Sequence, residues 1–439
     1  MEKINPFAYL YYHLYLLQLE EYDLTRFIRT IWHTKGIPRA QLRKKLVWTN
    51  KMILIAVITF GLILSFAYIV SFILFFVFYI SYIPLIVVVL LLTPLDLFFK
   101  KRRVNKAKEL LSRYPNLKII GIAGSYGKTT MKEAVSTVLE QKFTVVKTPE
   151  NINTPLGIAE LILKKVNEKT EVLVVEMGEY KRGDVKDICS LVKPQIGIIT
   201  GINEAHLERM GNLSNTVAAI FELAQNMDKD GFLALNNDCD LIHDHYKKYV
   251  THQQVVLYSF NNESALKSGL LGRYAVGVLS ATAAVAKRLG LSSEQIQSGA
   301  SHIKPLPHRL EPIAGARGVL VIDDSYNGNS EGVKEAIYLL STYGDRRKVY
   351  ITPGLVETGK LVSEVHKEIG RELSSIANFV VLIENSATPF IAEGLIENGF
   401  KKENIRWYKS SESAHADMAH IVEPNDVVLF QNDWPDNYR

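Results

Sequence analysis

The chain has 439 residues, a formal net charge of +5 and a hydrophobic fraction of 47%, enough for a membrane segment and two domains of ordinary size. The positive charge is concentrated in residues 1–99, and the remainder is nearly neutral, which excludes the basic surface typical of nucleic-acid-binding proteins. Cys189 and Cys239 lie far apart in the sequence. Their spacing excludes a zinc motif and a disulfide framework and fits a reducing compartment.

Residues 1–51 are predicted to form a basic, aromatic arm. Tyrosine, leucine and phenylalanine are frequent in residues 1–33, and residues 24–51 contain eight Lys/Arg and no acidic residue. Two interpretations fit this pattern equally: an amphipathic helix at a membrane interface and a helix packed on a soluble domain. The basic residues next to the following apolar segment favour contact with anionic membrane lipid.

Residues 52–95 form an apolar run of 44 residues without Asp, Glu, Lys, Arg or His. Such a run is long enough for two helical crossings of a bilayer, and two buried core helices are the alternative. Because Lys/Arg residues flank both ends, both ends are expected in the cytoplasm. The prediction is a transmembrane helical hairpin over residues 52–99 that turns near residues 79–84. The chain would then be a multi-pass protein of the cell membrane, with two helices and with its catalytic domains on the cytoplasmic side.

Strands and helices alternate from residue 117 to the C-terminus, which predicts an α/β fold. We expect a P-loop-type, mostly parallel central ATPase domain in residues 100–303. A smaller Rossmann-like C-terminal domain follows in residues 304–439, after a proline-containing linker near residues 303–307. Strands are predicted at residues 117–123, 172–176, 196–200, 231–235, 319–323, 348–352, 379–383 and 426–430.

The sequence Gly-Ile-Ala-Gly-Ser-Tyr-Gly-Lys-Thr-Thr, residues 121–130, lies between a predicted strand and a predicted helix. Glycines let backbone N–H groups approach phosphates, and the helix N-terminus adds positive potential. Lys128 would reach the terminal phosphates of ATP, and the hydroxyl of Thr129 would bind Mg²⁺. The residues expected to bind the nucleotide here are Gly124, Ser125, Tyr126, Gly127, Lys128, Thr129 and Thr130.

Two further polar side chains follow neighbouring strands. Glu176 ends the apolar strand at residues 172–176, and His206 follows the next strand. The carboxyl ends of parallel strands meet at one edge of a sheet, so we expect Glu176 beside the phosphates. Thr129 and Glu176 are candidate ligands of a first Mg²⁺, and His206 is a candidate ligand of a second metal ion.

Six motifs recur in the order in which they stand in the Mur ligases, and on these motifs the chain resembles that family. The resemblance extends from about residue 117 to the C-terminus. The motifs are Gly121–Thr130, residues 150–157 (Glu-Asn-Ile-Asn-Thr-Pro-Leu-Gly), 175–178 (Val-Glu-Met-Gly), 205–207 (Ala-His-Leu), 307–311 (Pro-His-Arg-Leu-Glu) and 322–327 (Ile-Asp-Asp-Ser-Tyr-Asn).

The resemblance implies an ATP- and Mg²⁺-dependent ligase that activates a carboxylate as an acyl phosphate and transfers it to an amine. It implies catalytic roles for Lys128, Glu176, His206 and Arg309, the last brought from the linker onto the nucleotide. Further nucleotide contacts are implied for Asp324, Tyr326 and Asn327, and contacts with the acceptor substrate for Asn151 and Asn153.

Four departures from the family pattern affect these expectations. Ile220 stands where the family usually carries a carbamylated lysine, and Glu222 is the nearest carboxylate that could replace it. Tyr274 and Ala275 replace an adenine-contacting His-Asn pair, and we expect Tyr274 to stack on the base. The sequence Phe-Gln-Asn-Asp-Trp-Pro-Asp from residue 430 replaces a Lys-Gly-Ser-Arg stretch. Residues 1–99 replace the family's UDP-sugar-binding domain, which leads to the hypothesis of a lipid-linked acceptor.

The sequence therefore predicts a membrane-anchored ligase that joins a carboxylate acceptor to an amino acid or dipeptide amine in the synthesis of peptidoglycan precursors or a related envelope polymer. A poly-γ-glutamate synthetase with the same core is one alternative. A nucleotide-binding scaffold without ligase activity is the other, and the substitutions at residues 220, 274 and 275 are its basis.

Overall fold

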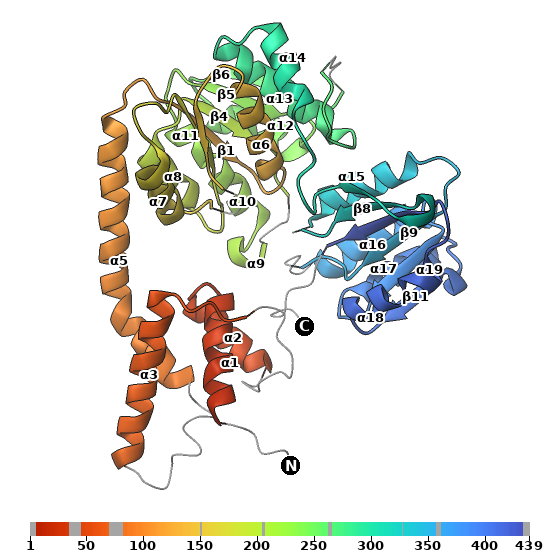
Figure 1. Ribbon diagram of the computed structural model, residues 1–439, viewed down its shortest axis with the longest axis horizontal. Coiled ribbons are helices and arrows are strands. Elements are labelled where there is room, and N and C mark those ends of the chain that lie inside the picture. Colours follow the sequence, from red (N-terminus) through yellow and green to blue (C-terminus); the bar gives the residue numbers. More distant parts are fainter. Residues whose placement is uncertain are drawn as a thin grey trace. The chain divides into compact units, whose positions relative to one another are not determined.

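The computed structural model describes residues 6–34, 45–69, 82–149, 152–203, 207–261, 266–326, 328–356 and 361–432 (Figure 1). The chain divides into two compact units. The first consists of Met1–Arg102 with Pro435–Arg439, and the second of Arg103–Trp434. The long helix α5 (Tyr82–Ser112) contributes to both.

The N-terminal unit is helical. Its helices are α1 (Pro6–Leu19), α2 (Leu24–Thr34), α3 (Asn50–Ile69) and the first part of α5. Side chains of all four helices share one apolar core, which includes Leu17, Phe27, Met52 and Leu85. Within α5, Asp96 accepts hydrogen bonds from the ammonium groups of Lys51 and Lys100, at 2.8 and 2.9 Å. The ion pair with Lys51 ties α3 to α5.

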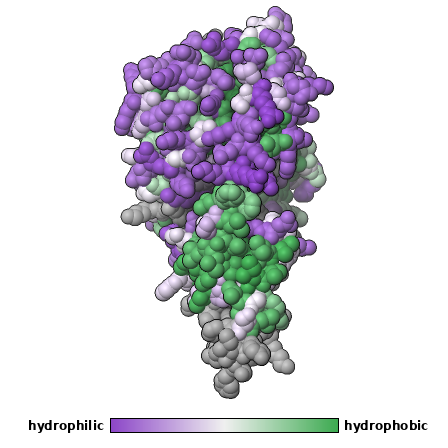
Figure 2. Space-filling model, turned by 90° about the vertical axis from the view of Figure 1, so that its left-hand side faces the viewer, coloured by the Kyte–Doolittle hydropathy of each residue, from purple (hydrophilic) through white to green (hydrophobic). Residues whose placement is uncertain are grey.

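Helices α3 and α5 also expose a broad apolar surface, visible in Figure 2. It contains the outward-facing side chains of Ile53, Leu54, Val57, Leu62, Leu64, Ile83, Val87, Leu90, Leu91, Leu95, Leu97, Phe98 and Phe99. The predicted apolar run is thus helical wherever the structure describes it. The predicted turn lies mostly outside the described residues, and Tyr82 and Pro84 form the first turn of α5.

The prediction of a multi-pass membrane protein was wrong. Among the described residues, one helix, Tyr82–Ser112, is long and apolar enough to cross a bilayer, and the stretch Asn50–Ser65 of α3 is a shorter apolar helix. Two crossings require two helices of about 20 apolar residues. A single helix of this length and composition is weak support for any crossing, because core helices of other proteins have the same properties.

The second unit begins with a six-stranded parallel sheet in the order β2-β3-β1-β4-β5-β6. Its strands are β1 (Lys118–Ala123), β2 (Val145–Lys147), β3 (Val172–Glu176), β4 (Ile196–Ile199), β5 (Phe232–Asn236) and β6 (Gln254–Tyr258). Its helices are α6 (Lys128–Leu139), α7 (Pro155–Lys165), α8 (Asp184–Val192), α9 (Leu207–Met210), α10 (Leu213–Ile220), α11 (Glu222–Asn226), α12 (Asp240–Tyr249), α13 (Tyr274–Arg288) and α14 (Ser293–Ser301).

Helices cover both faces of this sheet (Figure 1). In β3, Leu173 and Val175 enter one apolar cluster, and Val172 and Val174 enter another on the opposite face. A strand buried on both faces has a continuous apolar sequence, which explains why β3 was predicted correctly from sequence. The order of the strands reverses at β1, and ligands of open α/β sheets bind at such a point, outside the carboxyl ends of the strands.

The C-terminal part holds a second sheet in the order β11-β10-β9-β12-β8-β7, parallel except for the β7–β8 pair. Its strands are β7 (Glu311–Ala314), β8 (Leu320–Asp324), β9 (Lys348–Thr352), β10 (Phe379–Ile383), β11 (Ile405–Tyr408) and β12 (Val427–Gln431). Its helices are η1 (Ala316–Gly318), α15 (Ser330–Ser341), α16 (Val362–Ser374), α17 (Thr388–Glu397), η3 (Lys402–Asn404), α18 (Ser411–Ala416) and α19 (Met418–Ile421). The α/β class and the parallel first sheet are therefore confirmed, whereas the second sheet is mixed.

Helices α16 and α17 pack unusually closely, because a glycine of each faces the backbone of the other. A Cβ atom at Gly370 would lie 2.2 Å from the carbonyl oxygen of Ile391, and one at Gly394 would lie 2.2 Å from that of Lys367. No side chain fits at such distances, so the two helices would have to separate.

We expect Gly370→Ala to lower the free energy of unfolding by about 2 kcal/mol, through this overpacking. Gly61→Ala is the control, because a Cβ atom at Gly61 in α3 has no neighbour within 4 Å. It should leave stability unchanged or raise it by up to about 1 kcal/mol through higher helix propensity. Urea denaturation followed by circular dichroism measures both variants, and an unchanged midpoint for Gly370→Ala would contradict the packing argument.

Candidate functional site

The loop between β1 and α6 has the geometry of a phosphate-binding loop. Gly124 and Gly127 have φ values of 142° and 77°, which only glycine adopts readily. A Cβ atom at Gly124 would lie 2.3 Å from Oγ1 of Thr200. The N–H of Ser125 donates to the carbonyl oxygen of Gly201 at 2.7 Å, so the loop is fixed against the end of β4. Lys128 then begins α6, in agreement with the prediction that the glycine-rich motif opens a helix.

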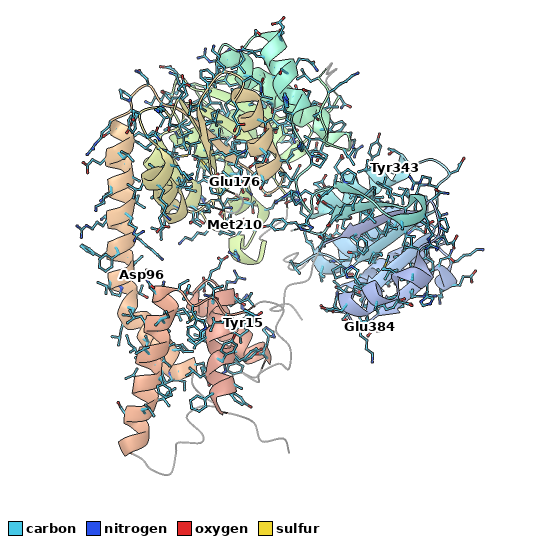
Figure 3. All side chains as sticks on the ribbon, viewed as in Figure 1. Tyr15, Asp96, Glu176, Met210, Tyr343 and Glu384 are labelled. Atoms are coloured by element: carbon cyan, nitrogen blue, oxygen red, sulfur yellow. The ribbon has the colours of Figure 1, made fainter. Side chains whose placement is uncertain are left out.

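Two buried ion pairs lie beside this loop. The ammonium group of Lys128 donates to Oε1 of Glu179 at 2.9 Å and to the carbonyl oxygen of Gly124. That of Lys132 donates to Oε2 of Glu176 at 3.1 Å, with the lysine side chain fully buried. Glu176 lies at the carboxyl end of β3 (Figure 3), as predicted. The sequence analysis missed Lys132 and Glu179, whose partners are set by the pairing of β1 with β3.

The oxygen atoms predicted to bind Mg²⁺ suit that ion. Thr129 offers a hydroxyl and Glu176 a carboxylate, and Mg²⁺ prefers oxygen ligands. The guanidinium of Arg309 lies 3.5 Å from Oγ1 of Thr129, so the structure brings together two residues that are 180 positions apart. His206 lies outside the described residues.

Ile220 and Glu222, the two positions considered for a second metal ion, have other roles in the structure. Ile220 is fully buried in the apolar core. The carboxylate of Glu222, considered above as a replacement ligand, accepts hydrogen bonds from the N–H groups of Gly183 and Lys186, at 2.8 and 3.0 Å. Gly183 immediately precedes α8 and Lys186 lies in its first turn, so Glu222 caps that helix instead.

A cavity of about 210 Å³ lies between the phosphate-binding loop and the C-terminal sheet. Its lining includes three predicted residues of the C-terminal part, Arg309, Asp324 and Tyr326. The guanidinium of Arg309 lies 4.8 Å from the ring centre of Tyr326. Of the residues predicted to bind the nucleotide, the cavity is lined by Tyr126, Gly127, Thr130, Tyr274, Arg309, Asp324 and Tyr326. Gly124, Ser125, Lys128 and Thr129 do not line it, and Asn327 lies outside the described residues.

Tyr274 lines the same cavity at the start of α13 and packs against the apolar cores of both domains. Its N–H donates to Oε2 of Glu335 at 3.3 Å, and the guanidinium of the preceding Arg273 donates to Oε1 of the same carboxylate at 2.5 Å. Phe260, which the sequence analysis missed, also lines the cavity, with the Arg273 guanidinium 5.1 Å from its ring centre. Tyr274 and Phe260 are thus candidates, among the aromatic residues that line the cavity, for contact with a base.

The predicted acceptor-binding residue Asn153 contacts Gly178, just after the end of β3. It is buried, and its carbonyl oxygen accepts from the N–H of Gly178 at 2.8 Å. Its side-chain oxygen has no hydrogen-bond partner among the described residues. Asn151 lies outside them.

Ile220→Lys tests whether this position tolerates the family's lysine. A charged ammonium group in the apolar core lacks partners, so we expect a loss of about 4 kcal/mol in the free energy of unfolding. Ser214→Lys, at an exposed position of the same helix, should change stability by less than about 0.5 kcal/mol. Equal denaturation midpoints for the two variants would show that position 220 accommodates the charge.

A second prediction concerns Asp324. Burial raises the pKa of its carboxyl from 3.8 to about 7, although the N–H of Leu310 and the charge of Arg309 oppose this shift. The folded state therefore binds this proton more tightly than the unfolded state. The resulting stabilisation is complete below about pH 4 and is lost as the pH rises through about 7.

Asp324→Asn remains neutral and should remove this dependence. Because the side chain keeps some contact with solvent, we expect the wild type to lose about 2 kcal/mol relative to the variant between about pH 4 and pH 8. Urea denaturation of both proteins across this range measures the difference. A difference that does not vary with pH would contradict the raised pKa.

Comparisons with known proteins identify the family. The model of the Mur ligase middle domain matches residues 122–293, and that of the Mur ligase glutamate ligase domain matches residues 308–431. UDP-N-acetylmuramoyl-tripeptide–D-alanyl-D-alanine ligase of Bacillus subtilis is 28% identical over 333 residues, 72% of each chain. The enzyme of the same name from Synechocystis is 26% identical over 329 residues, 71% of each chain.

Solved structures show the same fold. MurF from Acinetobacter baumannii matches with a TM-score of 0.67 at 20% identity, covering 76% of this chain and 77% of that one. MurF from Thermotoga maritima in complex with ADP matches with a TM-score of 0.65 at 22% identity, covering 76% and 80%. The relatives are named for a UDP-linked acceptor, so nothing supports the expected lipid-linked acceptor or membrane lipid as a partner. The chain belongs to the Mur ligase family, whose members are ATP-dependent ligases that form C–N bonds, and it carries the middle and C-terminal domains of that family.

Proposed function

We propose that the chain joins D-alanyl-D-alanine to the terminal carboxylate of a muramoyl-tripeptide, with ATP cleaved to ADP and phosphate. The observation that carries the proposal is the single cavity shared by the phosphate-binding loop and Arg309, Asp324 and Tyr326. The names of the relatives supply the two substrates.

The phosphate-binding loop and Lys128 hold the triphosphate in this proposal, through backbone N–H groups and one ammonium group. Thr129 and Glu176 hold Mg²⁺, which neutralises charge on the transferring phosphoryl group when it is bound. Arg309 approaches the same phosphates from the linker, which couples the C-terminal domain to the nucleotide. His206, Asn151 and Asn327 keep the metal, acceptor and nucleotide roles that the family resemblance implies.

The reaction has two steps. An oxygen of the acceptor carboxylate attacks the terminal phosphorus of ATP, ADP leaves, and an acyl phosphate forms. The nitrogen of the amine then attacks the carbonyl carbon, phosphate leaves, and the nitrogen loses a proton as the amide forms. Water would hydrolyse the acyl phosphate, so a site closed by both domains suits this chemistry.

ADP release by the full-length protein, with Lys128→Ala as the blank, tests the proposal. Muramoyl-tripeptide and polyglutamate acceptors are combined with D-alanyl-D-alanine or glutamate as the amine. We expect turnover only with the tripeptide and D-alanyl-D-alanine together, and a loss of at least about a hundredfold in Lys128→Ala, because a group that stabilises the transferring phosphoryl charge is removed.

Turnover with polyglutamate and glutamate would instead assign the chain to poly-γ-glutamate synthesis. ATP binding that responds to neither carboxylate nor amine would favour a scaffold without ligase activity.

A further inference from the structure

Glu179 is a buried carboxylate for which the proposed mechanism has no use. Its side chain is 1% exposed, and its only described ion-pair partner is Lys128. Oxygen Oε1 accepts from the Lys128 ammonium at 2.9 Å, whereas Oε2 is buried without a hydrogen-bond partner among the described residues. A buried carboxylate oxygen without a donor is costly, so this oxygen is a candidate for a ligand.

A second buried oxygen without a partner packs against the residue that precedes Glu179. The side-chain oxygen of Asn153 is buried and has no described donor. This amide packs against Gly178, the residue before Glu179, where an added Cβ atom would lie 2.9 Å from it. Both oxygens are pure acceptors, so the missing group must be a cation or carry hydrogen-bond donors.

The ammonium group of Lys128 shows what this place accepts in the absence of nucleotide. It lies between a carboxylate oxygen and the backbone carbonyl of Gly124, which is suitable surroundings for a group with three N–H donors. A lysine that opens the helix after a phosphate-binding loop turns to the phosphates once a triphosphate binds. Glu179 then loses its described counter-charge while it stays buried.

A primary ammonium group fits the vacated place better than Mg²⁺ does. Mg²⁺ requires six ligands at about 2.1 Å and usually keeps several waters. The partnerless side-chain oxygens of Asn153 and Glu179 are closed to solvent, which leaves no room for the waters of Mg²⁺. The group that leaves this place is the single ammonium group of Lys128. A substrate ammonium would restore the charge balance at Glu179 and supply the hydrogen-bond donors that these buried oxygens lack.

We propose that Glu179 and Asn153 form a subsite for a primary ammonium group of a substrate, opened when a triphosphate draws Lys128 away. This inference rests on the proposed ligase function for the source of the ammonium, either the incoming amine or an amino side chain of the acceptor. Where the incoming amine is the source, Glu179 also accepts the proton that the nitrogen loses before it attacks the acyl carbon. Nucleotide then binds before the ammonium-bearing substrate.

The first experiment measures binding without turnover. Calorimetry on the full-length protein, with Mg²⁺ and a non-hydrolysable ATP analogue, uses D-alanyl-D-alanine as the probe and its N-acetyl derivative as a probe without charge. We expect the dipeptide to bind only in the presence of the analogue, and Glu179→Gln to weaken it by about tenfold, since a charged hydrogen bond becomes a neutral one. The acetylated dipeptide should not respond to the variant.

The second experiment measures nucleotide affinity and needs no substrate. Glu179→Gln releases Lys128 from its ion pair, so the ATP analogue should bind about threefold to tenfold more tightly. Glu393→Gln is the matched control, because it removes a surface partner of Lys367 at the same distance of 2.9 Å. Tighter nucleotide binding together with a weaker ammonium probe distinguishes the subsite from a merely structural role, which would weaken both.

Steady-state kinetics identifies the source of the ammonium. A rise in KM for D-alanyl-D-alanine in Glu179→Gln assigns it to the amine. A rise in KM for a lysine-ending acceptor, without a change for a norleucine-ending one, assigns it to the acceptor. Unchanged KM values, or a higher Mg²⁺ requirement without an effect on either substrate, overturn the subsite.

The failure of this subsite and the failure of the proposed function give different results. If no substrate pair turns over, the two binding experiments still decide the subsite. If the wild type and Glu179→Gln turn over substrates equally well, the ligase function is supported and the subsite is contradicted. Thermal unfolding establishes that Glu179→Gln is folded. Glu179→Asp keeps the negative charge but has a side chain shorter by one methylene group, so it should give intermediate values in both binding experiments.

Discussion

The charge balance beside the phosphate-binding loop is the constraint on which this site depends. Two carboxylates, Glu176 and Glu179, are buried within four residues of one another, and each has a lysine from the first two turns of α6 as partner. A buried charge without a partner costs several kcal/mol. Helix α6, strand β3 and the loop after it are therefore held in one relative arrangement before any nucleotide arrives.

The two ion pairs differ in one respect that matters for function. Lys132 is fully buried, whereas the Lys128 side chain is 12% exposed. The Lys132–Glu176 pair therefore fixes the end of β3, and only Lys128 can exchange a carboxylate for a phosphate without unfolding the helix. The energetic cost of removing Lys128 from Glu179 is part of the cost of nucleotide binding, and a cation that replaces it lowers that cost.

Polar contacts connect the middle domain to the C-terminal domain around the nucleotide cavity. Arg309 reaches Thr129, Asn203 donates to Asn329, and Arg273 pairs with Glu335. Such contacts exchange with water at little net cost, unlike a large apolar interface. Contacts of this kind suit the opening and closure of the site that the proposed reaction, with its water-sensitive intermediate, requires.

The sequence was most informative where the chemistry is local. The strand, the glycine-rich loop and the helix are contiguous in the sequence, and the structure has them as β1, a loop with Gly124 and Gly127 at positive φ, and α6. The partners of Lys128 and Lys132 could not be predicted, because they depend on β1 pairing with β3 rather than with β2, which precedes β3 along the chain. Short edge strands such as β2 and β11 were missed for want of a continuous apolar run.

Hydropathy alone led to the prediction of a two-helix membrane hairpin in residues 52–99, which is more than an apolar sequence can establish. The apolar run correctly predicts helices, but apolar length does not distinguish lipid from other apolar surroundings, and the structure describes one helix of sufficient length rather than two.

The replacement of a lysine by Ile220 has a consequence that extends beyond one residue. Helix α10 ends there, Phe221 stacks on Tyr249 at 4.8 Å, and the Glu222 carboxylate caps α8. Three successive side chains are thus committed to packing and capping, and none can turn towards the phosphates without leaving a cavity or unpaired N–H groups. A cationic group bound near the reacting carboxylate therefore needs ligand oxygens from another part of the site. The loop after β3 offers such a ligand, because Glu179 lies there and one of its carboxylate oxygens has no described hydrogen-bond partner.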